Sequence, residues 1–202
     1  DGFEEVVVVY YASGTLHLKV IDNPGGGGAY NEYSKQLVTG ITGNLPVYPQ
    51  YQPALAKGDL DGDGKDELIL GFAYHAYIVD DKASGYAVTS RSYPNSRDLY
   101  IAAGDLDGDS RDEFIITCNY GGYAYCDVFD GSFSAPFLAR YEYTLHAANL
   151  SVTFEQLVRV AMGDIDGDGF DEIVLHGETL DGTRWALCAM DDAKNGFTWL
   201  DF

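Results

Sequence analysis

Short hydrophobic runs broken by Gly, Asp and Asn make up most of the chain. Three of these runs are apolar at consecutive positions, which is typical of strands covered on both faces. No segment shows a sustained helical period of 3.6 residues, so the pattern predicts strands joined by tight turns. The three apolar runs are residues 68–70, 114–116 and 173–175, and further predicted strands cover residues 16–21, 76–79, 123–129 and 185–190.

An acidic segment recurs along the chain without gaps. Residues 54–70, 100–116 and 159–175 share the pattern Ala-x-Gly-Asp-(Leu/Ile)-Asp-Gly-Asp-x-x-Asp-Glu followed by apolar residues, and residues 1–9 match the end of that pattern. The shared glutamates, Glu5, Glu67, Glu113 and Glu172, are 62, 46 and 59 residues apart. The shortest interval is about the length of one four-stranded propeller blade, and the longer ones indicate insertions.

The repeat predicts an all-β fold, a β-propeller of four-stranded blades. The predicted blades cover approximately residues 1–47, 48–95, 96–145 and 146–202, and the acidic loop joins the first two strands of each. A β-sandwich is the structural alternative, but it gives no reason for one loop to recur in register. Because the first blade lacks its inner strand, we expect a larger propeller, completed by a longer chain or by a partner subunit.

The acidic loop has the composition of a metal site. Acidic residues at loop positions 1, 3, 5 and 9 converge when the backbone curls, glycine at positions 4 and 6 permits the curl, and the carbonyl at position 7 can add an oxygen. Such an all-oxygen cage favours Ca²⁺ over Mg²⁺, which prefers a stricter octahedron, and over Zn²⁺, which prefers His or Cys. EF-hand loops need an acid at position 12 and a following helix, whereas position 12 is apolar here.

The predicted ligands follow from these positions. They are Asp59, Asp61, Asp63, the Lys65 carbonyl and Glu67; Asp105, Asp107, Asp109, the Arg111 carbonyl and Glu113; and Asp164, Asp166, Asp168, the Phe170 carbonyl and Glu172. The truncated first loop retains only Asp1, the Phe3 carbonyl and Glu5. Ser110 replaces a position-6 glycine and is expected to weaken its site. The position-8 aspartates, Asp66, Asp112 and Asp171, are expected to face solvent or cap a strand.

The Gly-Asp-(Leu/Ile)-Asp-Gly-Asp-x-x-Asp-Glu pattern resembles the FG-GAP/VCBS repeat of integrin-α-type β-propellers. The resemblance implies a propeller that holds Ca²⁺ in the loop between the first two strands of a blade. Similar repeats occur in adhesion receptors, lectins, secreted polysaccharide lyases and toxin subunits, so the resemblance does not fix a biochemical role. Because extracellular Ca²⁺ is millimolar, we expect an extracellular, secreted or cell-surface location. The chain departs from the family in having Glu at position 9 and in lacking a clear Phe-Gly and Gly-Ala-Pro signature.

Charge and composition limit the classes of binding partner. The formal net charge of −20 disfavours binding to nucleic acid and to anionic membranes. The sequence contains no run of 18 apolar residues, the length that a membrane-spanning helix needs. The three cysteines are too few for a disulfide scaffold; Cys118 and Cys126 bridge only if a three-residue turn places them opposite one another. Asn149 begins a single glycosylation sequon.

Two functions remain open from the sequence. One is a non-catalytic, calcium-stabilised module for adhesion, binding or assembly, with a protein or glycan ligand at the blade loops. The other is the propeller domain of a secreted carbohydrate-active enzyme such as a polysaccharide lyase. The four histidines are scattered and no catalytic motif is present, which favours the non-catalytic reading.

Overall fold

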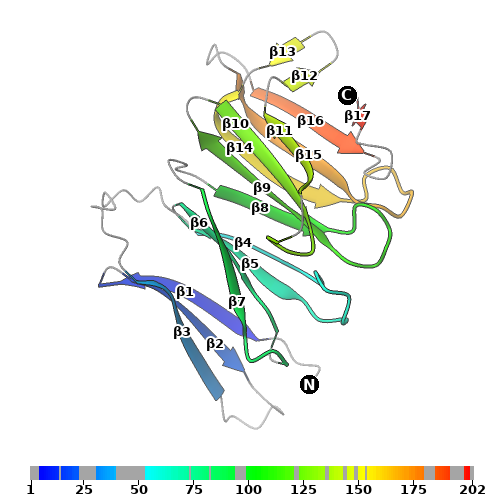
Figure 1. Cartoon of the computed structure of the whole chain (residues 1–202). Helices are drawn as coiled ribbons and strands as arrows, with labels where there is room; N and C mark the ends of the chain where they lie inside the picture. The colour runs from blue at the N-terminus through cyan, green and yellow to red at the C-terminus, as the bar shows by residue number, and fades with distance from the viewer. Residues whose placement is uncertain are drawn as a thin grey trace. The chain divides into compact units, whose positions relative to one another are not determined.

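The regular structure among the described residues is β-strand throughout, arranged in antiparallel sheets (Figure 1). The structure is a computed structural model. It describes residues 5–13, 15–22, 31–39, 53–72, 74–81, 83–93, 99–120, 123–134, 137–142, 145–147, 150–152, 154–179, 185–191 and 198–200. The predicted all-β class is confirmed. The described part of the chain contains no helix long and apolar enough to cross a membrane.

The chain divides into two compact units, of which the first is Asp1–Gln50. This unit holds one three-stranded sheet of β1 (Val6–Ala12), β2 (Thr15–Asp22) and β3 (Asn31–Thr39), in the order β1-β2-β3. Alternate residues of β2, Leu16, Leu18 and Val20, are buried, while His17 stacks on Tyr10 across the β1–β2 pair with ring centroids 4.9 Å apart. The alternation indicates a sheet with one covered face.

The second unit, Tyr51–Phe202, contains three four-stranded sheets in which strand order follows chain order. The first sheet is β4 (Ala54–Gly58), β5 (Glu67–Phe72), β6 (His75–Val79) and β7 (Val88–Ser92). The second is β8 (Leu99–Gly104), β9 (Glu113–Tyr120), β10 (Tyr123–Asp130) and β11 (Phe137–Glu142). The third is β14 (Phe154–Gly163), β15 (Glu172–Thr179), β16 (Trp185–Asp191) and β17 (Thr198–Leu200).

A small hairpin of β12 (Leu145–Ala147) and β13 (Leu150–Val152) precedes the third sheet, and the sequence pattern did not predict it. The four larger sheets fall within the four predicted repeat ranges, and in the second unit each acidic loop joins the first two strands of its sheet. Their arrangement as blades of one propeller stays a prediction.

The second strand of each four-stranded sheet carries fully buried apolar residues. Ile69 and Leu70 in β5, Ile115 and Ile116 in β9, and Leu175 in β15 are all fully covered. Consecutive apolar residues require cover on both faces of a strand, because neighbouring side chains point to opposite sides. The prediction from the apolar runs is therefore confirmed for β5 and β9, whereas in β15 Ile173 and Leu175 are buried on one face and Val174 between them is half-buried.

The core of the second unit lies between its first two sheets. Phe114 and Phe129 stack with centroids 4.7 Å apart, and Phe133 meets them edge-on at 5.4 and 5.5 Å. The sheets approach closely at Gly71, where an added Cβ would lie 3.0 Å from side-chain atoms of Ile101. The first strands are neighbours as well, since β8 packs against both β4 and β14 (Figure 1).

The β9–β10 hairpin settles the arrangement of its cysteines. Tyr120 pairs with Tyr123, so two residues form the turn, and Cys126 lies opposite Thr117 while Cys118 lies opposite Tyr125. The two thiols are buried on opposite faces, and no disulfide joins them. Asn149 lies outside the described residues.

Candidate metal centre

The first acidic loop, residues 59–67, is curled around the carboxylate of Asp59. Asp59 Oδ1 accepts a hydrogen bond from the Gly62 amide and Oδ2 accepts one from the Gly64 amide, both at 2.8 Å. Gly62 and Gly64 have φ angles of +79° and +85°, which residues with a Cβ rarely adopt. The alternating glycines therefore allow one aspartate to gather the loop backbone about itself.

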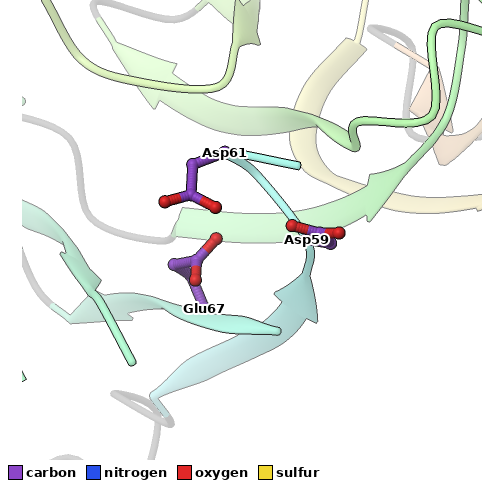
Figure 2. Close-up of side chains that lie close together, drawn as sticks. All are labelled: Asp59, Asp61 and Glu67. Atoms are coloured by element: carbon purple, nitrogen blue, oxygen red, sulfur yellow. The ribbon is translucent and has the colours of Figure 1, made fainter. Parts of the chain in front are cut away.

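Asp61 and Glu67 of this loop turn toward the same point. Asp61 Oδ1 accepts the Asp63 amide at 3.0 Å, and Glu67 Oε2 accepts the Leu60 amide at 2.8 Å. Figure 2 shows the carboxylates of Asp61 and Glu67 pointing toward one another with Asp59 beside them. Each bond to a backbone amide leaves further carboxylate lone pairs for a shared ligand.

The same triad forms in all three complete loops. In each, one ligand atom per residue lies within 4.8 Å of the others. The amide bonds repeat as well: Glu113 Oε2 accepts the Leu106 amide at 2.8 Å, and Glu172 Oε2 accepts the Ile165 amide at 2.6 Å. The triads are Asp59, Asp61 and Glu67; Asp105, Asp107 and Glu113; and Asp164, Asp166 and Glu172.

The burial of the position-9 glutamates indicates that the triads suit a cation. Glu67, Glu113 and Glu172 are only 4%, 1% and 0% exposed, and the Oε1 atoms of Glu67 and Glu172 have no hydrogen-bond partner. A buried carboxylate oxygen without a donor is costly, and a cation held by the triad removes that cost. Because no His or Cys belongs to the triads, the donor set is that of a hard ion.

Burial and like charge raise the pKa of these glutamates when no cation is bound. Burial is the larger cause in each, and neighbouring aspartates add to it, so the pKa of Glu67 rises to about 7 and that of Glu113 to about 8. The pKa of Glu172 is raised for the same reasons. The metal-free loop thus holds carboxylates that resist ionisation near neutral pH.

The position-5 aspartates, Asp63, Asp109 and Asp168, lie outside the triads. Each accepts the amide two residues further on, from Lys65, Arg111 and Phe170. In the first loop Lys65 Nζ also contacts Asp63 Oδ2 at 2.6 Å and Asp81 Oδ2 at 2.5 Å. Ligation by these aspartates and by the position-7 carbonyls stays a prediction. Asp1 and Phe3 lie outside the described residues, and Glu5 is exposed.

Ser110 keeps the loop conformation despite its Cβ. Its φ angle is +71°, in the left-handed region, and its amide donates to Asp105 Oδ2 at 3.2 Å, as the Gly169 amide does to Asp164 Oδ2. The second loop therefore forms the same hydrogen bonds as the third, with the strain of a non-glycine residue at positive φ. The expected weakening of this site stays a prediction.

The expectation that the position-8 aspartates face solvent or cap a strand is wrong for two of them. Asp112 Oδ2 accepts the Asp59 amide at 2.9 Å, and the Asp112 amide donates to the Asp59 carbonyl at 2.8 Å. The Asp171 amide likewise donates to the Asp105 carbonyl at 2.8 Å. Asp66 is exposed and forms an ion pair with Lys57. Asp112 and Asp171 therefore join one loop to the preceding one.

Comparison with known proteins gives one informative likeness. No protein-family model and no curated protein matches the chain. Among solved structures, it is similar to the rhamnogalacturonan lyase PL11 of Bacillus licheniformis, with 17% sequence identity and a TM-score of 0.53. The match covers 93% of this chain but 42% of the lyase. At this identity the likeness concerns the fold alone, and the chain spans less than half the length of that protein.

Proposed function

We propose that the chain is a calcium-stabilised β-propeller segment, built from FG-GAP/VCBS-like repeats, that serves as an extracellular binding or structural module. The observation that supports the metal role most strongly is the recurrence, at three loops in register, of an acidic triad with a buried glutamate. Acidic turns that merely face water would leave the glutamate exposed, whereas all three are covered.

Calcium is the proposed ion because of the chemistry of the donors. The triads offer only carboxylate oxygens, and the predicted position-7 carbonyls would add further oxygens, a set that suits the six to eight oxygen ligands of Ca²⁺. When bound, the ion supplies positive charge that compensates the clustered carboxylates. The chain's own residues contribute the curl at the glycines, the amide bonds that orient Asp59 and Glu67, and the cover over the glutamate.

The propeller arrangement is supported by the sheets of the second unit. Each is a four-stranded antiparallel meander with its metal loop after the first strand, and β8 lies between β4 and β14. Such neighbouring first strands are expected of blades that line a common axis, and the small residues Ala56, Ala102 and Ala161 suit that place.

The proposed location and ligand follow from the ion and the charge. Extracellular Ca²⁺ is millimolar, a concentration at or above the usual Kd of extracellular Ca²⁺ modules. A chain with a net charge of −20 repels phosphate backbones, so a protein or a glycan is the proposed ligand, held by loops at one end of the blades.

Thermal unfolding with and without Ca²⁺ tests this proposal. A site with free Ca²⁺ at a hundred times its Kd stabilises the fold by about 2.7 kcal/mol, which raises the Tm of a domain of this size by about 5 to 10 °C. Chelation should lower the Tm and Ca²⁺ should restore it, with Mg²⁺ less effective. Glu172→Gln should reduce the response, whereas the exposed control Glu32→Gln should keep it. An unchanged Tm would contradict the proposal.

A second candidate function is favoured by the structural likeness. The neighbour is a rhamnogalacturonan lyase, so the chain is proposed alternatively as a module of a secreted polysaccharide lyase. Incubation of the protein with pectic and other uronic polysaccharides, monitored by the absorbance of unsaturated uronates, distinguishes the two. A rise in absorbance supports the lyase; glycan-array binding without turnover supports the non-catalytic module.

A further inference from the structure

We propose that Asp112 and Asp171 are positioning residues that couple neighbouring metal loops, so that a cation in one loop favours binding of a cation in the next. This inference rests on the proposed function, because it concerns the same triads. It adds that the loops do not bind independently, and it assigns the coupling to the position-8 aspartate of the following loop.

The contact between the first two loops is a pair of reciprocal hydrogen bonds. The Asp112 carboxylate accepts a hydrogen bond from the Asp59 amide at 2.9 Å, and the Asp112 amide donates one to the Asp59 carbonyl at 2.8 Å. Both backbone polar groups of Asp59, the first triad member of its loop, are therefore held by one residue of the following repeat. At the next boundary the Asp171 amide donates to the carbonyl of Asp105, also a first triad member.

Glycines before each loop provide the space for this contact. A Cβ on Gly58 would lie 2.7 Å from Asp112 Oδ2, and a Cβ on Gly104 would lie 2.0 Å from Asp171 Oδ2. Atoms at those distances cannot coexist, so a side chain at either glycine would displace the carboxylate of the next repeat from its present position. The same approach recurs at both boundaries.

The position-4 glycines make a second contact of the same kind. A Cβ on Gly62 would lie 3.2 Å from the Arg111 side chain, and one on Gly108 would lie 1.9 Å from Phe170 Cε1. Positions 7 and 8 of one loop therefore pack on positions 4 and 1 of the loop before it. In the third loop, a Cβ added to Gly163 or Gly167 would have no atom of another described residue within 4 Å, apart from the glycine's chain neighbours.

Each position-8 aspartate is adjacent in sequence to a triad glutamate, so its contact with the preceding loop can couple the two sites. Asp112 is followed directly by Glu113, the buried triad member of the second loop, and Asp171 by Glu172 of the third. A cation on the first triad fixes Asp59, which fixes its partner Asp112, and thereby reduces the freedom that Glu113 must lose on binding its own cation. Such coupling is reciprocal, so binding at the second loop favours binding at the first equally.

A double-mutant cycle tests the inference. Glu67→Gln disables the first loop, and calorimetric Ca²⁺ titration of the whole chain then gives the Kd of the remaining sites. With Asp112 present, Glu67→Gln should weaken those sites by about fivefold or more, the lower range of typical couplings. In the Asp112→Ala background the same change should alter them by less than about twofold, because the carboxylate that holds the Asp59 amide is gone and only the backbone bond from residue 112 to the Asp59 carbonyl remains.

Asp66→Ala is the matched control, since Asp66 occupies position 8 of the first loop but pairs with Lys57. In that background Glu67→Gln should keep its full effect. Asp112→Asn retains a side-chain oxygen for the Asp59 amide and should restore the coupling that Asp112→Ala removes, which a general loss of stability would not explain. If Asp112→Ala does not fold, Asp171→Ala with Glu113→Gln repeats the cycle at the second boundary, where the substitution removes the carboxylate that lies against Gly104 and leaves the backbone bond to Asp105.

The outcomes separate this inference from the proposed function. Absence of Ca²⁺ binding by the wild type would overturn the proposed function and the inference together. Binding by three sites, with the same effect of Glu67→Gln in the Asp112→Ala and Asp66→Ala backgrounds, would overturn the inference alone.

Discussion

The Glu113→Gln substitution should stabilise the metal-free protein but destabilise the Ca²⁺-bound protein. Without metal, Glu113 is 1% exposed and its pKa is raised from 4.5 to about 8, chiefly by burial and then by Asp107, Asp109 and Asp105. The unfolded chain ionises this group above pH 4.5, while the folded chain keeps it protonated until about pH 8. The free energy of unfolding of the metal-free protein therefore decreases as the pH rises from 4.5 to about 8.

The magnitude follows from the two pKa values. A tenfold change in an ionisation constant corresponds to about 1.4 kcal/mol, so the raised pKa costs the metal-free fold up to about 5 kcal/mol at pH 8 and almost nothing at pH 4.5. Glutamine is neutral at both and retains an oxygen for the Leu106 amide, which Glu113 accepts at 2.8 Å. With Ca²⁺ bound, by contrast, the wild type gains a charged ligand that glutamine lacks. A hundredfold loss of affinity at the second site would then cost about 2.7 kcal/mol.

Urea unfolding of the wild type and Glu113→Gln, between pH 5 and 8.5, with and without Ca²⁺, measures both effects. In the metal-free protein the variant should be the more stable at pH 8, with a smaller difference at pH 5. In saturating Ca²⁺ it should be the less stable. Glu32→Gln, an exposed glutamate of β3, controls for the loss of charge. A variant that is less stable than the wild type under all conditions would refute the reasoning.

Further predictions concern the loop contacts and the core. Gly108→Ala should destabilise the fold by more than Gly167→Ala in urea unfolding: both have positive φ, which costs about 1 kcal/mol, but only Gly108 lies against the next loop. Equal losses would contradict the contact. Phe114→Ala should cost about 3 to 5 kcal/mol by the same measurement, since Phe114 is fully buried; a loss under about 1 kcal/mol would place it outside the core. Lys65→Ala should tighten Ca²⁺ binding at the first loop in a calorimetric titration, because it frees Asp63 from an ammonium group; weaker binding would argue against position-5 ligation.

Local patterns predicted the strands, and three of the five ligands predicted for each complete loop lie together, because both features depend on residues close in sequence. The apolar runs after each loop became β5, β9 and β15, and in β5 and β9 consecutive apolar side chains are buried on both faces. The triads follow from the spacing of Asp59, Asp61 and Glu67 on a loop that glycine allows to curl.

Contacts between repeats were not predictable in the same way. Asp112 and its partner Asp59 are 53 residues apart, and a single sequence gives no sign that one loop lies on another. The recurrence of Gly58 and Gly104 before each loop was the available signal, but a glycine gives no sign of which residue lies against it. Lys65 bridging Asp63 and Asp81 was missed for the same reason, since Asp81 belongs to the segment after β6.

The number of Ca²⁺ ions that the chain binds tests the central claim most directly. Equilibrium dialysis of metal-free protein against micromolar to millimolar Ca²⁺, with the bound metal measured by atomic emission, gives that number. The three complete triads predict three ions per chain, released by chelation, and two in Glu67→Gln. A chain that retains no Ca²⁺ at millimolar concentration would contradict the account.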